Sequence, residues 1–231
     1  MSTAFAYALP RMHARMAERA DERARKRLAA VDDFGHFVQL AARGGFGPWL
    51  KNLGTTSGVH AVEYALREAY RARLGELAGW LSRRWRPAVE WLALAPDLPV
   101  LAELLQQGRR AEWMALDPRW SRLPTEPGKL RQALLEHWPE LEPFGDDRLA
   151  EAWFERARML LPPLNKRSAR MLEALLQAHL ELADADRLIK LFRRESAAPV
   201  RVFAWTGLER LDFEFLRGHL VRRRLQMREA A

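Results

Sequence analysis

The sequence has no cysteine among its 231 residues. Disulfides, thiolate metal sites, iron–sulfur clusters and cysteine nucleophiles are therefore excluded together. No apolar run approaches the roughly 18 residues needed to span a bilayer, so we expect any membrane association to be peripheral. Acidic residues are in deficit, because 30 Asp and Glu stand against 38 Lys and Arg and leave a formal net charge of +8.

Residues that favour β-sheets are also scarce. Val, Ile and Thr together number 15, with a single Ile at position 189, whereas Leu alone occurs 37 times. β-Branched residues pack well on pleated sheets and lose rotamer freedom in helices, and Leu, Ala, Arg and Glu do the reverse. The composition therefore predicts an all-α fold.

Apolar residues recur at spacings of three and four along much of the chain, which is the pattern of amphipathic helices. The predicted helical stripes cover residues 12–31, 59–85, 98–105, 149–161, 169–182 and 208–225. The glycine-containing segments 43–49 and 52–58 are predicted to be turns. We expect one all-helical domain over residues 1–231, and the segment 117–129 is where an internal division would fall.

Common catalytic and cofactor motifs are missing from the sequence. The six histidines include no pair at i, i+4 spacing, Gly128-Lys129 lacks the rest of a phosphate loop, and no serine sits in a GxSxG turn. Carboxylates are interleaved with arginines, which favours solvated ion pairs. We therefore expect no catalytic residues, no metal site and no cofactor.

Two features of the composition concern partners. Nine tryptophans are spread along the helical stripes, where core packing is the first interpretation and nucleobase stacking the alternative. Arg11, Arg15 and Arg19 follow an i, i+4 row and form a basic ridge on one helical face. Such a ridge is either a solvated face or a docking surface for an acidic protein, anionic lipid or nucleic acid.

Three segments repeat an Asp followed four residues later by a Leu. The pairs are Asp97 and Leu101, Asp184 and Leu188, and Asp212 and Leu216. On a helix these positions share one row, so each Asp is predicted to stand near the start of an apolar ridge. The repeat indicates related helical modules around a common axis, or chance similarity among Leu-rich helices.

The chain resembles a family of rotary ATPase subunits, named C in A-type ATPases and d in eukaryotic V-type ATPases. The opening Phe5-Ala6-Tyr7-x3-Arg11-x3-Arg15 is similar to the start of that family. The stretch 34–50 is similar to its Leu-rich helix and Tyr-Gly-type turn, with Phe46-Gly47 in that place. The Asp-centred segments are similar to its recurring D-x-x-N-L helix start.

The chain also departs from the family pattern. The Asn of the helix start is replaced by Val100, Arg187 and Phe215, so any hydrogen bond made by that Asn is lost. The chain is shorter than the usual members, which suggests that a module is trimmed or fused around residues 108–165.

The resemblance implies a funnel-like bundle of repeated helical modules with pseudo-threefold symmetry. It also implies a non-catalytic central-stalk adaptor that links the shaft subunits of a rotary ATPase to the membrane proteolipid ring in proton or sodium transport. Such an adaptor is peripheral to the cytoplasmic face of the inner membrane. Arg11 and Arg15, as members of the matched opening, become candidate partner contacts, with an ion pair inside the bundle as the alternative.

A second class of function stays open from composition alone. A basic all-helical protein could bind nucleic acid or act as a regulatory protein with no link to an ATPase. Binding would then weaken steeply with salt, because phosphate contacts release counterions. The adaptor hypothesis expects no nucleic-acid partner.

Overall fold

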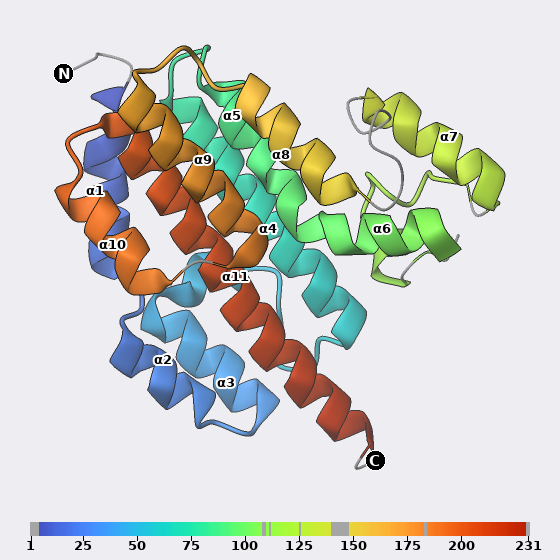
Figure 1. Cartoon of the computed structure of the whole chain (residues 1–231). Coiled ribbons are helices and arrows are strands. Elements are labelled where there is room, and N and C mark those ends of the chain that lie inside the picture. The colour runs from blue at the N-terminus through green and yellow to red at the C-terminus, as the bar shows by residue number, and fades with distance from the viewer. Residues whose placement is uncertain are drawn as a thin grey trace.

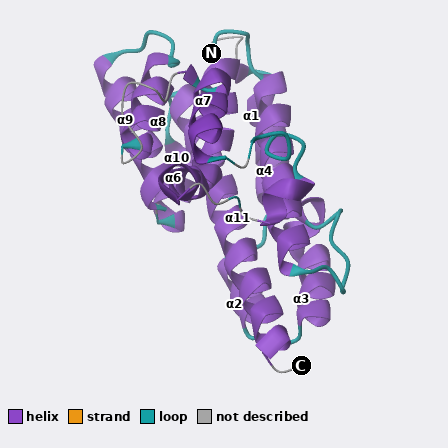
Figure 2. Ribbon diagram, turned by 90° about the vertical axis from the view of Figure 1, so that its right-hand side faces the viewer, coloured by secondary structure: helices purple, strands orange, loops and turns teal. Residues whose placement is uncertain are grey.

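The structure, a computed structural model, describes residues 5–107, 110, 112–124, 126–139, 148–182 and 184–229. Every regular element in these ranges is helical and none is a strand (Figures 1 and 2), so the predicted all-α fold is confirmed. The α-helices are α1 (Ala8–Glu18), α2 (Glu22–Ala29), α3 (Phe34–Ala41), α4 (Val59–Trp80), α5 (Arg86–Trp91), α6 (Leu98–Gln107), α7 (Pro127–His137), α8 (Leu149–Met159), α9 (Lys166–Glu181), α10 (Ala185–Arg194) and α11 (Ala198–Glu229). Short π or 3-10 turns are η2 (Ala42–Phe46), η3 (Gly47–Trp49), η4 (Leu92–Asp97) and η5 (Glu112–Leu116).

Helix α11 is the axis of the molecule and runs through most of its length in Figure 1. Helices α9 and α10 pack against its N-terminal half, α4 runs beside it, and α3 packs near its C-terminal half. The segment Val202–Trp205 is buried on every side of α11. A helix that is apolar all round belongs in a core, which explains why α11 occupies the centre.

Tryptophans fill this core. Seven of the nine are buried, and Trp80 and Trp91 are half-buried and packed against it. The indole Nε1 of Trp91 donates to the carbonyl oxygen of Trp153 at 2.9 Å. The first interpretation of the tryptophans, core packing, is confirmed for the seven buried ones, and the two half-buried ones also pack against the core.

The helical stripe predicted over residues 12–31 is two helices in the structure. Helix α1 ends at Glu18, and Asp21 begins α2 by accepting a hydrogen bond from the backbone N–H of Ala24 at 2.7 Å. Gly45 reaches this break from η2, with a φ of +95°. The break therefore lets the turn over residues 42–49 pass close to the backbone of the first two helices.

The C-terminal part of α11 holds the end of α2. Arg223 is buried, lies over the ring of Phe37, and donates to the carbonyl oxygens of Ala29 at 3.1 Å and Val31 at 2.7 Å. The last carbonyls of a helix lack intrahelical partners, so a cation there is favourable. Arg223 is thus a structural residue.

The suggested division near 117–129 stays a prediction. At its start Asp117 and Trp120 are buried, and Trp120 packs against Trp138 with ring centroids 5.1 Å apart. Among the described residues no helix is both long enough and apolar enough to cross a bilayer.

Replacing Gly45 with Ala should destabilise the protein by roughly 2 kcal/mol or more, since φ is unfavourable for other residues. The new Cβ would also lie 2.5 Å from the carbonyl oxygen of Glu18. Gly44 is the matched control, because its φ is −95° and nothing lies within 4 Å of a Cβ there. Urea unfolding of both variants tests this prediction. Equal losses of unfolding free energy for Gly45→Ala and Gly44→Ala would contradict it.

Candidate functional site

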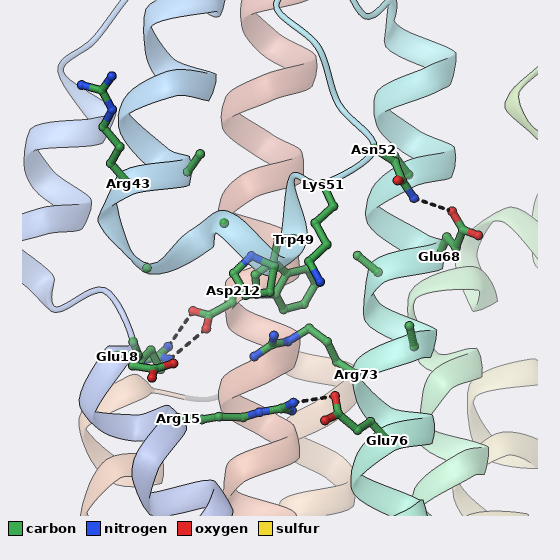
Figure 3. A pocket seen from close by; sticks show the side chains of 18 of the residues that line it. Arg15, Glu18, Arg43, Trp49, Lys51, Asn52, Glu68, Arg73, Glu76 and Asp212 are labelled. Atoms are coloured by element: carbon green, nitrogen blue, oxygen red, sulfur yellow. Dashed lines mark hydrogen bonds and ion pairs between the residues drawn. The ribbon is translucent and has the colours of Figure 1, made fainter.

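A hollow of about 850 Å³ lies between the end of α1, the turn over residues 42–52, α4 and α11 (Figure 3). We call it the central hollow. Its lining includes Arg15 and Arg19 from the first helix and its end, Gly47 and Trp49 from the turn, and Asp212 from α11. Segments far apart in the sequence therefore form its walls.

Asp212 anchors one wall of the hollow. Its carboxylate accepts from Arg19 Nε at 2.9 Å and Nη2 at 2.8 Å, a bidentate pair, and also contacts Arg25. The guanidinium of Arg25 lies 5.3 Å and 5.0 Å from the ring centroids of Phe46 and Phe215, which stack on each other with centroids 5.6 Å apart. One buried carboxylate thus fixes the end of α1 and the start of α2 to the middle of α11.

Burial shifts the pKa of both arginines downward. Burial lowers the pKa of Arg25 to about 9, and the charge of Arg19 adds to the effect. Burial likewise lowers the pKa of Arg19 to about 10, with Glu209 opposing the shift. Both guanidinium groups remain charged near neutral pH, so the contacts with Asp212 are ion pairs.

Two further ion pairs brace the hollow. Arg73 on α4 pairs with Glu209 on α11, with Nη2 and Oε1 2.7 Å apart. Arg15 on α1 pairs with Glu76 on α4 and lies over the ring of Trp80. These contacts join α1, α4 and α11 around the hollow and neutralise the cations of its walls.

The rim of the hollow carries charge that the described residues do not neutralise. Arg43 and Lys51 are exposed and line it, and neither has an ion-pair partner within the described ranges. Glu68, also on the rim, accepts a hydrogen bond from Asn52 at 3.2 Å. The rim therefore offers both charge signs to a partner.

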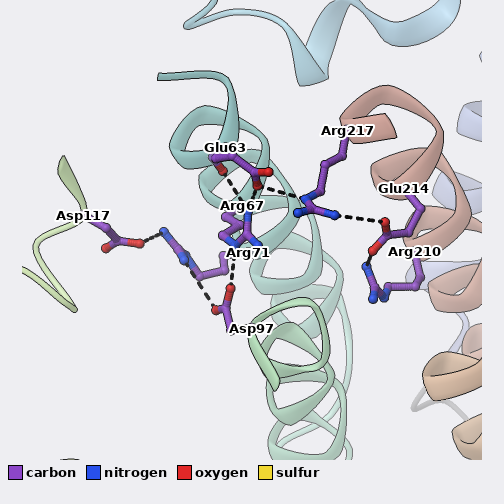
Figure 4. Close-up of polar contacts among 8 residues, drawn as sticks. All are labelled: Glu63, Arg67, Arg71, Asp97, Asp117, Arg210, Glu214 and Arg217. Carbon is purple, nitrogen blue, oxygen red and sulfur yellow. Dashed lines mark hydrogen bonds and ion pairs between the residues drawn. The ribbon is translucent and has the colours of Figure 1, made fainter. Parts of the chain in front are cut away.

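A second polar cluster lies within the body of the protein (Figure 4). Arg67, which is buried, donates from Nε to Asp97 at 2.9 Å and contacts Glu63 one turn earlier on α4. Arg71 pairs with Asp117 and also lies 3.8 Å from Asp97, so it links the two carboxylates. Arg217 on α11 donates from Nε to Glu63 at 2.9 Å. We call these residues the buried ionic cluster.

The two central carboxylates of the cluster have opposite pKa shifts. Burial would raise the pKa of Glu63, but hydrogen bonds and charges from Arg217 and Arg67 outweigh it and hold the pKa below its usual value. Burial raises the pKa of Asp97, and Arg67 and Arg71 only partly offset this. Two arginines that donate directly to Glu63 account for the difference.

His179 is the most deeply buried histidine of the described chain. Burial lowers its pKa to about 3, with the charge of Arg210 adding to the effect. Thr206 donates its hydroxyl to the carbonyl oxygen of Phe203, so the Nε2–H of His179 donates to Thr206 at 2.9 Å. This neutral imidazole serves packing, and the described residues include no group of three His, Asp or Glu side chains able to hold a metal.

The structure places the three repeat aspartates in three different environments. Asp184 begins α10 and accepts from the backbone N–H of Asp186 at 3.0 Å, as predicted. Asp97 immediately precedes α6, but its carboxylate pairs with Arg67 and does not cap the helix. Asp212 lies within α11, so the prediction that it starts a helix is wrong. Its carboxylate is held by Arg19 and Arg25, and α11 continues past it.

The apolar half of the repeat behaves more uniformly. Leu101, Leu188 and Leu216 are all buried in the core. The spacing therefore predicted which side chains face inward, because that depends only on helical periodicity. The role of each Asp depends on what the fold brings to it.

The predicted ridge of Arg11, Arg15 and Arg19 is not a single free surface. Arg11 is exposed, lies over its neighbour Tyr7 and donates to the carbonyl oxygen of Tyr7 at 3.1 Å. Arg15 makes the ion pair with Glu76, which is the alternative considered for it, and Arg19 turns inward to Asp212. Only Arg11 keeps the exposure expected of a partner contact.

The prediction that carboxylates form solvated ion pairs is wrong for five of them. Glu63, Asp97, Asp117, Glu209 and Asp212 are all buried. Their partners lie 30 or more residues away in most cases, as with Arg67 and Asp97 or Arg19 and Asp212. No local pattern in the sequence signals such pairs.

Asp212→Asn should lower the free energy of unfolding by roughly 3 kcal/mol or more, because two half-buried arginines lose the buried carboxylate that pairs with them. Asp184→Asn is the matched control, since this exposed position is a helix N-cap where Asn serves as well. Chemical denaturation compares the two variants. A loss no larger at Asp212 than at Asp184 would contradict the anchoring role.

The stability provided by Glu63 should depend on pH. Its folded pKa is depressed, so its contribution is complete above its ordinary pKa of roughly 4.3 and is lost as the pH falls through the folded value. Glu63→Gln should therefore be less stable than the wild type at pH 7, and the gap should narrow at about pH 3. The exposed Glu90 on α5 supplies the control, Glu90→Gln. If the difference in unfolding free energy between Glu63→Gln and the wild type stays constant with pH, the ionised Glu63 does not provide this stability.

Comparisons with known proteins identify no relative of this chain. No family model matches it, and no match is found among curated proteins or solved structures.

Proposed function

We propose that this protein is a non-catalytic adaptor in the central stalk of a V/A-type rotary ATPase. One observation carries the proposal: three of the segments that bear the likeness to the ATPase family, the opening, the stretch 34–50 and the segment around Asp212, meet at the central hollow, whereas Asp97 and Asp184 do not line it. Arg15 belongs to the first segment, Gly47 to the second and Asp212 to the third, and all line it. Residues that carry a family likeness and converge on one place are expected to serve a shared role.

The lining of the hollow suits an incoming helix. Helix α4 presents Ala65, Ala69 and Ala72 to it, at the three- and four-residue spacing of one helical face. Small side chains let two helices approach closely, and the mixed charges of the rim can set the register of a partner. In this proposal the hollow receives a helix of the rotor shaft, and the opposite part of the molecule rests on the membrane proteolipid ring.

The ion pairs around the hollow support a mechanical role. Arg19–Asp212, Arg73–Glu209 and Arg15–Glu76 tie α1, α4 and α11 together. A part that passes torque between the shaft and the ring must resist local opening, because a compliant part would dissipate the torque. The funnel-like shape, the pseudo-threefold arrangement and the position at the cytoplasmic face of the inner membrane all belong to this proposal.

The nucleic-acid alternative has less support. Its two arguments were the net charge and the tryptophans, and all nine tryptophans are buried or half-buried. Many arginines are also committed to pairs within the protein, among them Arg19, Arg67 and Arg73. Only the net charge of +8 remains in favour of a phosphate backbone.

Affinity purification of the tagged full chain from gently solubilised native membranes tests the proposal. The wild type should recover shaft and ring subunits of the ATPase. Ala72→Trp, which fills the hollow from an exposed position on α4, should lose the shaft subunits because the entering helix is blocked. Ala17→Trp is the control, since Ala17 is exposed on α1 and does not line the hollow.

Two outcomes would contradict the adaptor. One is recovery of nucleic acid or cytosolic enzymes in place of ATPase subunits. The other is equal recovery of the shaft with Ala72→Trp and Ala17→Trp, which would show that the hollow is not the contact.

A further inference from the structure

A second cavity, of about 310 Å³, lies at the end of the molecule where the chain enters α1 and α11. We call it the N-terminal pocket. Phe5 and Leu9 line it from the start of the chain, Trp85 from the turn before α5, Leu164 from the loop before α9, and Pro199 from the start of α11. Its volume is at the lower end of the range, about 300–1,000 Å³, of pockets that hold small molecules.

The apolar walls of the N-terminal pocket are held in place by the core. Phe5, Leu9 and Trp85 are each 5% exposed or less. The rings of Phe5 and Trp85 meet edge to face with centroids 5.2 Å apart, and Trp85 packs in turn against Phe203 on α11. A pocket with such walls exists before a ligand arrives, so binding does not have to order them.

Polar groups around the pocket are few, and most are already used. Of its described lining side chains, Arg84, Arg201 and Ser196 are polar and none is acidic. Arg201 donates from Nε to the carbonyl oxygen of Phe192 at 2.9 Å, and Ser196 donates its hydroxyl to Glu195 at 3.1 Å. Arg84 is exposed and makes no hydrogen bond or ion pair to another described residue, so its charge is available at the mouth.

Glu195, the acidic neighbour of the lining residue Ser196, contacts groups other than Arg84. The Glu195 carboxylate accepts from the backbone N–H groups of Ser196 at 2.9 Å and Ala197 at 3.1 Å. It also pairs with Arg167. The pocket thus combines an apolar interior with two cations that pair with no acidic residue of the described ranges. Arg201 hydrogen-bonds to Phe192 and His13, and Arg84 has no hydrogen-bond partner there.

We propose that the N-terminal pocket binds a medium-chain carboxylate, the anion of a free fatty acid. The acyl chain packs against Phe5, Leu9 and Trp85, where apolar surface leaves water. The carboxylate meets the guanidinium of Arg84, whose planar fork matches it. A ligand with one anionic end and no other polar group fits a pocket that has apolar walls, no acidic lining residue and, in Arg84, one guanidinium with no hydrogen-bond partner among the described residues. This inference is independent of the adaptor role.

Isothermal titration calorimetry with decanoate, kept below its micelle-forming concentration, tests the proposal on the full chain. The wild type should bind one decanoate, and Arg84→Gln should weaken binding roughly tenfold through loss of one charge-assisted hydrogen-bonded pair. Arg83→Gln should leave binding unchanged, because Arg83 is an equally exposed neighbour that does not line the pocket. Decanol should bind the wild type about as weakly as decanoate binds Arg84→Gln.

Leu9→Trp provides a second readout, since the larger side chain fills the pocket and should abolish binding. Thermal unfolding checks that this variant folds, and if it does not, the comparison of Arg84→Gln with Arg83→Gln decides. Three results would overturn the proposal. The first is that the wild type does not bind decanoate. The second is that Arg84→Gln and Arg83→Gln lose equal affinity for decanoate. The third is that decylammonium binds as tightly as decanoate.

Discussion

The structure depends on carboxylates buried along α11 and α4 and on the arginines that reach them from distant parts of the chain. Asp212 receives Arg19 and Arg25, and Glu209 receives Arg73. An isolated charge in a protein interior is costly, so each carboxylate is tolerable only while its arginine is in place. The positions of the first two helices and of α4 are therefore specified by a small number of charge pairs, in addition to the apolar contacts.

The same pairs create the space that a partner would occupy. Because Arg19 and Arg73 are drawn toward α11, the ends of α1 and α4 are kept in place around the central hollow. The turn over residues 42–49 closes one side, and the φ of Gly45 allows it to touch the backbone at the end of α1. In the proposed adaptor role, a hollow braced in this way would be firm before a partner arrives, as mechanical coupling would require.

Much of the helical content could be predicted from the sequence, and the polar architecture could not. The stripe over residues 59–85 corresponds to α4, and that over 169–182 to α9, because burial of one helical face leaves a periodic trace. The break between α1 and α2 was missed, although Asp21 is a good N-cap, because apolar and basic residues continue through it. The pairs Arg67–Asp97 and Arg19–Asp212 leave no such trace, since their partners are 30 and 193 residues apart. The resemblance to the ATPase family does not indicate which charges are buried.

The span between Arg19 and Asp212 also constrains how the protein is made. The two residues are separated by 193 positions. At a synthesis rate of about 5–20 residues per second, the arginine leaves the ribosome roughly 10 to 40 s before its carboxylate. During that interval the first two helices have neither Asp212 nor the carbonyl-binding Arg223, both of which come from α11. The first two helices therefore lack these contacts during synthesis, and their final arrangement is set only when the last long helix emerges.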